Sequence, residues 1–176
     1  MMNIQYEDGF KKKGYVSVSD GDAIEKIDRI ARLFGIPICG RGGIRRRDYN
    51  GNYRYKGAAV YPSQDSFEIW WPMQGNSRSP WHNEFYDSDT IVHEYHIDEA
   101  KSRSHVEGVI RANRQRVVWA HRENGRGGYC YKFVGVFKLN AEESRRLNKA
   151  VWERVADKFE LASKQFNGEA QDQVGV

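Results

Sequence analysis

The strongest constraint on the fold is a pair of β-forming runs joined by a glycine turn in the C-terminal half of the chain. Residues 115–123 read QRVVWAHRE, residues 129–140 read YCYKFVGVFKLN, and the segment between them is NGRGG. β-branched and aromatic residues favour strands, and a short glycine-rich segment between two such runs is typical of a β-hairpin. The sequence therefore predicts an antiparallel hairpin here, and the rest of the sheet must form around it.

Several shorter runs predict further strands. They occupy residues 14–20, 58–62, 67–72 and 89–97, and a polar, proline-bearing loop is expected over residues 74–88. Between them the glycine-rich stretch ICGRGGIRRRDYNGNYRYKG is expected to be a flexible or strand-edged basic loop, with a hairpin turn at YNGNY.

Helices are expected at few places. Residues 23–35 have apolar residues at helical spacing, with Asp20 or Asp22 as the cap and Gly35 as the stop, and residues 105–115 are a weaker candidate. The segment after Asn140 is ambiguous, because its four-residue apolar spacing fits one long helix, whereas residues 150–156 also alternate as a strand does. We favour a short helix followed by a strand.

The fold class that follows is α+β. Strands that do not alternate regularly with helices predict a small curved β-barrel, mixed or antiparallel, with a few flanking helices. At 176 residues the chain is expected to form a single globular domain over residues 1–166, followed by a disordered tail at 167–176.

Composition excludes several classes of protein. No run approaches the ~20 apolar residues of a membrane span, and the N-terminus lacks the apolar middle of a signal peptide, so a soluble, cytoplasmic protein is expected. The two cysteines, Cys39 and Cys130, have neither disulfide-framework nor zinc-site spacing. No metal and no cofactor is expected.

The positive charge of the chain is concentrated in two blocks rich in arginine. The net charge is only +4, but residues 41–56 hold six basic residues against one acid, and a second basic stretch covers residues 101–126. The arginine fork suits phosphates and base edges, although arginines also simply solvate loops. The candidates for nucleic-acid contact are Arg41, Arg45, Arg46, Arg47, Arg54, Arg116, Arg122 and Arg126.

Aromatic residues beside these blocks suggest a pocket for a base. Exposed rings stack on unpaired or flipped bases, and a carboxylate or histidine can hydrogen-bond a base edge. The alternative is that most of these rings belong to the core, since tryptophan is usually buried. The candidate pocket residues are Trp70, Trp71, Trp81, Trp119, Tyr131 and Glu94.

Catalytic motifs are weak. His93 and His96 in HEYHIDE would point to opposite faces of a strand, which argues against a metal site, and no nucleophile motif is present. The two GRGG segments, residues 40–43 and 125–128, either offer backbone amides to a phosphate or simply form turns.

The late strands resemble those of a known superfamily. Tyr129, Tyr131, Gly135 and Phe137, followed by a returning strand at residues 151–154, are similar to the closing strands of PUA-like domains, especially SRA (YDG) domains, with EVE domains as relatives. The resemblance implies a compact β-barrel that reads a modified base, often flipped out, in the restriction of modified DNA. It also implies a nuclease as a separate partner.

Three functional hypotheses remain open at this stage. The first, which we favour, is a DNA-binding module that recognises a modified or flipped base, with DNA preferred over RNA. The second is a small metal-dependent nuclease or nucleotide hydrolase that would use Glu68, Glu94 and His96. The third is a phage or bacterial protein-interaction factor.

Overall fold

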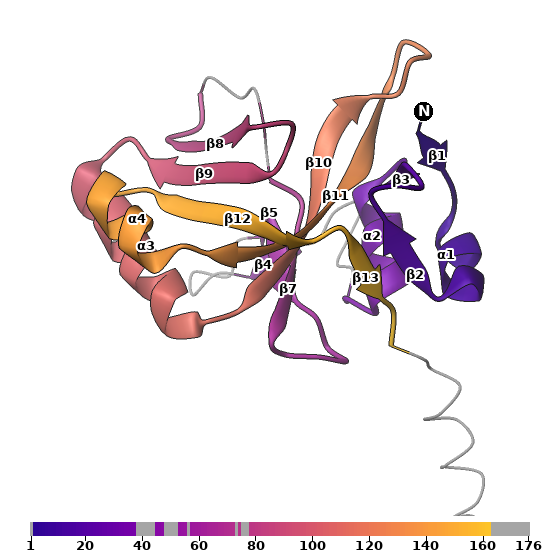
Figure 1. The fold of residues 1–176 in the computed structure, drawn as a ribbon, viewed down its shortest axis with the longest axis horizontal. Helices are drawn as coiled ribbons and strands as arrows, with labels where there is room; N and C mark the ends of the chain where they lie inside the picture. The colour runs from indigo at the N-terminus through magenta and orange to yellow at the C-terminus, as the bar shows by residue number, and fades with distance from the viewer. Residues whose placement is uncertain are drawn as a thin grey trace, which may run out of the picture.

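A curled β-sheet with helices packed against it organises the chain (Figure 1). The computed structural model describes residues 2–37, 57–72, 74 and 78–162, and the backbone alone of residues 45–47 and 53–55. The elements are, in chain order, β1 (Asn3–Ile4), α1 (Glu7–Lys13), β2 (Tyr15–Ser17), β3 (Asp22–Ile24), α2 (Ile27–Phe34), β4 (Arg45–Arg47), β5 (Tyr53–Tyr55), β6 (Ala58–Val60), β7 (Phe67–Trp70), β8 (Trp81–Tyr86), β9 (Ile91–His96), α3 (Glu99–Ala112), β10 (Gln115–Glu123), β11 (Tyr129–Leu139), α4 (Ala141–Leu147), β12 (Ala150–Ala156) and β13 (Lys158–Glu160).

The large sheet is mixed. Its main strand order is β6-β7-β10-β11-β12-β9-β8, and β3 with β1 adds to the side of β11. β7 and β10 run parallel, while the other neighbours along the main path are antiparallel. The sheet therefore curls into a half-barrel with β6 and β8 at its two ends, and the predicted fold class is confirmed.

The strand pairing is irregular where β11 passes between its two neighbours. Pairing shifts by one residue after Val118 on the β10 side and after Val136 on the β12 side, as a β-bulge does. Gly135 lies between these shifts with a φ of +123°, and a Cβ atom there would come within 2.4 Å of the Arg154 side chain. Only glycine fits this close crossing of strands.

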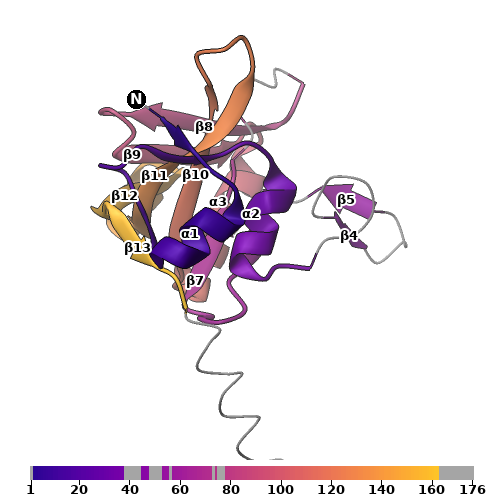
Figure 2. The ribbon, with the colours of Figure 1, turned by 90° about the vertical axis from the view of Figure 1, so that its right-hand side faces the viewer.

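Two hydrophobic cores lie on opposite faces of the central strands. The first core lies under α1 and α2, which pack side by side (Figure 2). The second core lies on the inner face of the half-barrel, where α3 covers it. Along β10, Val117 and Trp119 enter the first core, and Val118 and Ala120 enter the second. The uninterrupted apolar run of this strand follows from burial on both faces.

The hairpin and the C-terminal segment match their predictions. β10 and β11 pair antiparallel over the predicted residues. The short helix and following strand are also confirmed as α4 and β12, and the Asn140 side chain caps α4 by accepting a hydrogen bond from the Glu143 amide at 3.1 Å. β4 and β5 pair antiparallel on either side of the predicted YNGNY turn. The turn itself and the predicted tail lie outside the described residues.

The first predicted helix begins later than expected. α2 starts at Ile27, because Asp22 belongs to β3 instead of capping the helix. The Asp22 carboxylate is fully buried and accepts hydrogen bonds from the Ser17 amide at 2.9 Å and from Lys13 Nζ at 2.6 Å. The same carboxylate accepts from Asn3 Nδ2 at 3.0 Å, so it joins β1, α1 and β2 to its own strand and is not available as a helix cap. The predicted end of the helix at Gly35, in the left-handed conformation, is correct.

Two other boundaries differ from prediction. The expected loop over residues 74–88 contains β8, and the weak helix candidate is the longer α3. Asp98 starts α3 by accepting a hydrogen bond from the Lys101 amide at 3.0 Å, and Asn113 ends it in the left-handed conformation. The cap lies seven residues before the segment that was predicted.

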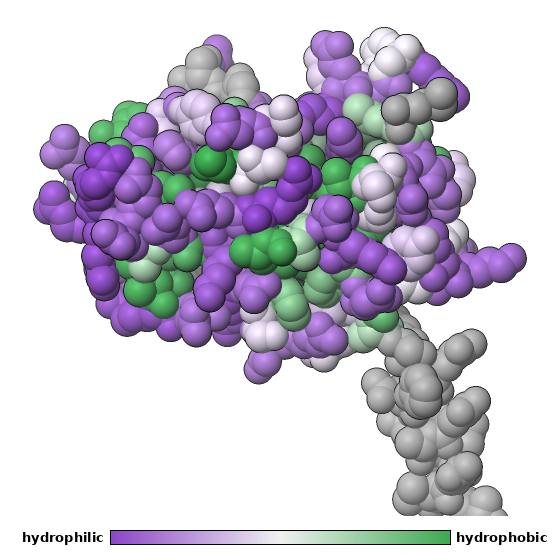
Figure 3. All heavy atoms as spheres, viewed as in Figure 1, coloured by the Kyte–Doolittle hydropathy of each residue, from purple (hydrophilic) through white to green (hydrophobic). Residues whose placement is uncertain are grey.

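The surface seen in Figure 3 is mainly hydrophilic, with small hydrophobic patches between polar side chains. Among the described residues, no helix is long and apolar enough to span a membrane.

Candidate nucleic-acid interface

The inner face of β8 and β9 carries polar and aromatic residues where a core strand would carry aliphatic ones. Phe85 and Val92 pack into the second core, so the residues two and four positions away point to the same side. In the antiparallel register Trp81 pairs with His96, and Asn83 pairs with Glu94. The four residues therefore form a polar extension of the second core.

Glu94 is the centre of this extension, and three donors converge on its Oε1 atom. His105 Nε2 from α3 lies 2.7 Å away, and Arg116 Nη1 from β10 lies 3.0 Å away. The indole nitrogen of Trp152 from β12 lies 3.4 Å away. We call Glu94, His105, Arg116 and Trp152 the Glu94 cluster.

The carboxyl of Glu94 stays ionised although only 12% of its side chain is exposed. Burial by itself would raise the pKa of this group, but the positive charge of Arg116 and the hydrogen bonds from the imidazole and the indole outweigh it. The pKa falls to about 2. The inner face therefore carries an ionised carboxylate that is paired with Arg116 and offers hydrogen-bond acceptor oxygens.

Trp81 forms the exposed end of the same face. Its ring is 38% exposed and meets the rings of His96 at 4.9 Å and His105 at 4.8 Å, both edge to face. A hollow of about 410 Å³ opens here, lined by Trp81, His96, Lys101, Ser104 and His105. His105 lines the hollow and also bonds Glu94, so the hollow adjoins the Glu94 cluster.

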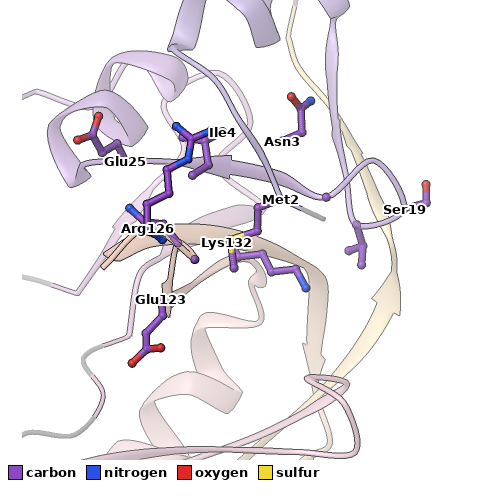
Figure 4. A pocket seen from close by; sticks show the side chains of 12 residues that line it. Met2, Asn3, Ile4, Ser19, Glu25, Glu123, Arg126 and Lys132 are labelled. Atoms are coloured by element: carbon purple, nitrogen blue, oxygen red, sulfur yellow. Dashed lines mark hydrogen bonds between the residues drawn. The ribbon is translucent and has the colours of Figure 1, made fainter. Parts of the chain in front are cut away.

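The projecting end of the β10–β11 hairpin carries the remaining predicted arginines that the structure describes (Figure 1). Arg122 is bound: its guanidinium contacts Asp89 at 2.7 Å and Gln74 at 2.8 Å. Arg126 at the tip pairs with no carboxylate of the described residues. Arg126 and Lys132 line a cleft of about 980 Å³ between the hairpin and the N-terminal strands (Figure 4).

The Gly-Arg-Gly-Gly turn at residues 125–128 has its own acceptor. Asn124 Oδ1 receives the Arg126 amide at 2.8 Å and the Gly128 amide at 3.1 Å. These amides serve the turn instead of pointing to a phosphate, so the turn interpretation holds for this segment. The other segment, residues 40–43, lies outside the described residues.

The predicted pocket residues divide among three places. Trp71 and Trp119 are 3% and 0% exposed in the first core, so they belong to the core and not to a pocket. Tyr131 lies on the hairpin, with its ring 5.3 Å from that of His121. Trp70, Trp81 and Glu94 share the inner face of the half-barrel, but Trp70 is 3% exposed, so it belongs to the second core and not to a pocket.

The arginines that were predicted to contact phosphate also lie in different places. Arg116 is 4% exposed and paired with Glu94, so it cannot reach a phosphate without leaving the core. The side chains of Arg41, Arg45, Arg46, Arg47 and Arg54 lie outside the described residues.

Residues that the sequence did not single out complete the inner face. Asn83 belongs to it on β8, and Lys101, Ser104 and His105 line the adjoining hollow from α3. The alternation of β8 was a possible signal for Asn83, whereas the approach of His105 to Glu94 depends on how α3 packs. His93 lies on the outer face, against Tyr86, while His96 faces Trp81. Within the residues that the structure describes, no three His, Cys, Asp or Glu side chains gather as a metal site.

Comparison with known families identifies this architecture. The model of the SRA (SET and RING associated) domain matches residues 9–161. The chain belongs to the SRA family. The predicted resemblance is thereby confirmed and extends well beyond the late strands, and SRA domains bind DNA that carries modified bases.

A solved structure shows the same fold. The 5-hydroxymethylcytosine-specific restriction enzyme AbaSI aligns with this SRA chain at a TM-score of 0.66 and 19% identity, over 90% of this chain. The match covers 46% of the enzyme, so the SRA chain spans about half of that protein's length. No curated protein matches the sequence.

Proposed function

We propose that this chain reads a modified base in double-stranded DNA and holds it, flipped out of the helix, on the inner face of the half-barrel at Trp81 and Glu94. The observation that carries the proposal is a carboxylate of fixed charge beside a hollow that has an exposed indole at its edge. Family membership supports the same function.

The two residues would read the base in different ways. A flipped base stacks on an aromatic ring, which is worth about 1 to 3 kcal/mol, and the exposed Trp81 ring is suited to this. A carboxylate accepts from the exocyclic amine of cytosine. Glu94 Oε2 takes part in none of the three bonds made by Oε1, so it is the oxygen that we assign to the base.

The DNA backbone would be held by the hairpin and the basic loop. Arg126 and Lys132 line a cleft beside the projecting hairpin and make no ion pair with described residues. We add to them the predicted arginines Arg41, Arg45, Arg46, Arg47 and Arg54. Arg116 and Arg122 are left out, because each is held by a carboxylate of the fold.

We also infer a restriction context, because the similar fold occurs in an enzyme named for cleaving DNA that contains 5-hydroxymethylcytosine. In this proposal another protein or another part of a longer chain makes the cut.

Binding to matched duplexes tests the proposal. Fluorescence anisotropy is measured with 5-hydroxymethylcytosine, 5-methylcytosine or plain cytosine at one position, over a series of salt concentrations. We expect tighter binding to one modified duplex and affinity that falls steeply with salt for all three. Equal affinity for all three duplexes contradicts base reading, and no affinity for any of them favours an interaction factor.

Two variants locate the pocket. Trp81→Ala and Glu94→Gln should each weaken binding to the modified duplex about tenfold or more and reduce the preference for it. Glu142→Gln, on α4 away from the inner face, is the control and should bind as the parent does. Circular dichroism shows whether each variant is folded. Since Trp81 is partly exposed, its variant remains informative even if Glu94→Gln is unstable.

A further inference from the structure

Arg116 is a buried cation that the proposed base contact does not use directly. Its side chain is 5% exposed, although arginine is rarely buried to this extent without a specific reason. It comes from β10, on the strand face that otherwise enters the second core through Val118 and Ala120.

Three groups fix the guanidinium in place. Its central carbon lies over the ring of Trp70 at 4.4 Å and over the ring of Trp152 at 4.1 Å. Its Nη1 atom donates to Glu94 at 3.0 Å. Cation-π contacts with two indoles and one charge-assisted hydrogen bond leave little freedom for the group to turn.

The remaining contacts are incomplete, which argues against a purely structural ion pair. Glu68 Oε2 lies 3.8 Å from Arg116 Nε, beyond hydrogen-bond distance, and this nitrogen donates to no described acceptor. A buried ion pair with an unsatisfied donor contributes little to stability compared with a well-packed apolar pair. The charge of Arg116 is therefore better explained by its effect on Glu94.

We infer that Arg116 is a positioning residue for base reading: it holds the Glu94 carboxylate ionised and directs it, by occupying Oε1, so that Oε2 is presented to the base. The inference rests on the proposed function, because it assumes that Glu94 contacts the base. It adds that recognition depends on a residue that touches neither the base nor the phosphates.

The charged and titratable groups around Glu94 set the expected effect of removing this arginine. They are Arg116 from β10, His105 from α3, Glu68 from β7 and His96 from β9 itself. Without Arg116 the carboxyl keeps its burial and loses its main cation, so its pKa rises towards or above the ordinary 4.5. Recognition should then become sensitive to pH.

The test uses Arg116→Met, which fills the space between the two indoles without a charge. Affinity for the duplex carrying one 5-hydroxymethylcytosine is measured from pH 8 to pH 4 for the parent and for Arg116→Met, Arg116→Lys and Arg116→Met/Glu94→Gln. Arg145→Met, which removes the exposed partner of Glu107, is the control. Carboxyl carbon NMR follows the titration of Glu94 in the free parent and in the variants.

Arg116→Met should lose affinity about tenfold for each pH unit below the new pKa of Glu94, while the parent and Arg145→Met lose none through this group. Arg116→Lys should restore most of the parent profile. The double variant should lack the additional slope.

If affinity depends on pH in Arg116→Met as it does in the parent, the inference is overturned. This holds even if Glu94→Gln weakens binding as proposed. If the parent shows no preference for the modified duplex, the proposed function fails, and the NMR titration still judges the role of Arg116. If Arg116→Met does not fold, the NMR titration of Glu94 in the parent protein is the test. A Glu94 pKa near 4.5 overturns the inference, and a pKa near 2 supports it.

Discussion

The two faces of strand β10 bury very different groups. On one face Val117 and Trp119 enter a closed apolar core under α1 and α2. On the other face Val118 and Ala120 lie beside Arg116, which is paired with Glu94 near an open hollow. A closed apolar face of the first kind is what selection for stability alone would produce. The second face keeps buried charges that stability does not require, and the difference locates the candidate site.

The largest expected effect is on the closed face. Trp119→Ala should lower the free energy of unfolding by about 4 kcal/mol, because Phe10, Phe34 and Phe133 all contact this ring and would line the resulting cavity. Thermal unfolding should show a decrease in Tm of roughly 10 °C. DNA preference, measured where the variant is folded, should stay as in the parent. A changed preference would show that the two faces are not separate in function.

The next effect lies where β11 is shared by both cores. Gly135→Ala should lower the free energy of unfolding by about 3 kcal/mol, since the added Cβ meets Arg154 and the φ of +123° is strained for alanine. Urea unfolding checks this, with Gly108→Ala as a control in α3, where an added Cβ meets nothing. Equal stability of the two variants would contradict the role given to the bulged crossing.

The open face should respond to acid. Because the pKa of Glu94 is lowered to about 2, its contribution to stability is complete above its ordinary pKa of 4.5 and is lost as the pH falls towards 2. The shift corresponds to about 3 kcal/mol at most. Urea unfolding between pH 7 and pH 2 should therefore show a smaller acid loss in Glu94→Gln than in the parent. Parallel curves for the two proteins would contradict the fixed charge.

The smallest effect concerns the hairpin tip. Arg126→Ala should weaken binding to modified and plain duplexes by a similar factor and reduce the slope of log affinity against log salt by about 1, as the loss of one phosphate contact does. Arg145→Ala, which breaks a surface pair with Glu107, should leave the slope unchanged. A loss confined to the modified duplex would instead assign Arg126 to base reading.

The same comparison explains what the sequence could predict. β10 and β11 were predictable because burial on both faces gives them long β-branched and aromatic runs. β8 was mistaken for a loop because its inner residues, Trp81 and Asn83, are as polar or amphipathic as its outer ones. A strand whose inner face lines a binding site does not show the alternation of apolar and polar residues that is seen in a strand packed only against a core.

The candidate site was harder to predict than the fold, because its contacts join distant segments. Trp119 stands in the apolar run VVWA and Trp81 in the polar segment SPWHNE, but both were predicted as pocket residues, and only the fold shows that Trp119 is buried and Trp81 partly exposed. Arg116 was expected to contact phosphate, as most arginines in a basic block would, and its pairing with Glu94 arises from strands and a helix that meet only in the folded chain. Glu94 was predicted as a pocket residue, but the donors that hold it were not.

The contact between Arg122 and Asp89 has a mechanical consequence. Asp87, Ser88 and Asp89 all have positive φ values, between 51° and 64°, so the turn that joins β8 to β9 is held in a conformation that these residues disfavour. Arg122 fastens this turn to the hairpin at 2.7 Å. The contact therefore ties the β8–β9 turn to the β10–β11 hairpin, so that the edge strand β8, which carries Trp81, is anchored to the hairpin as well as to β9.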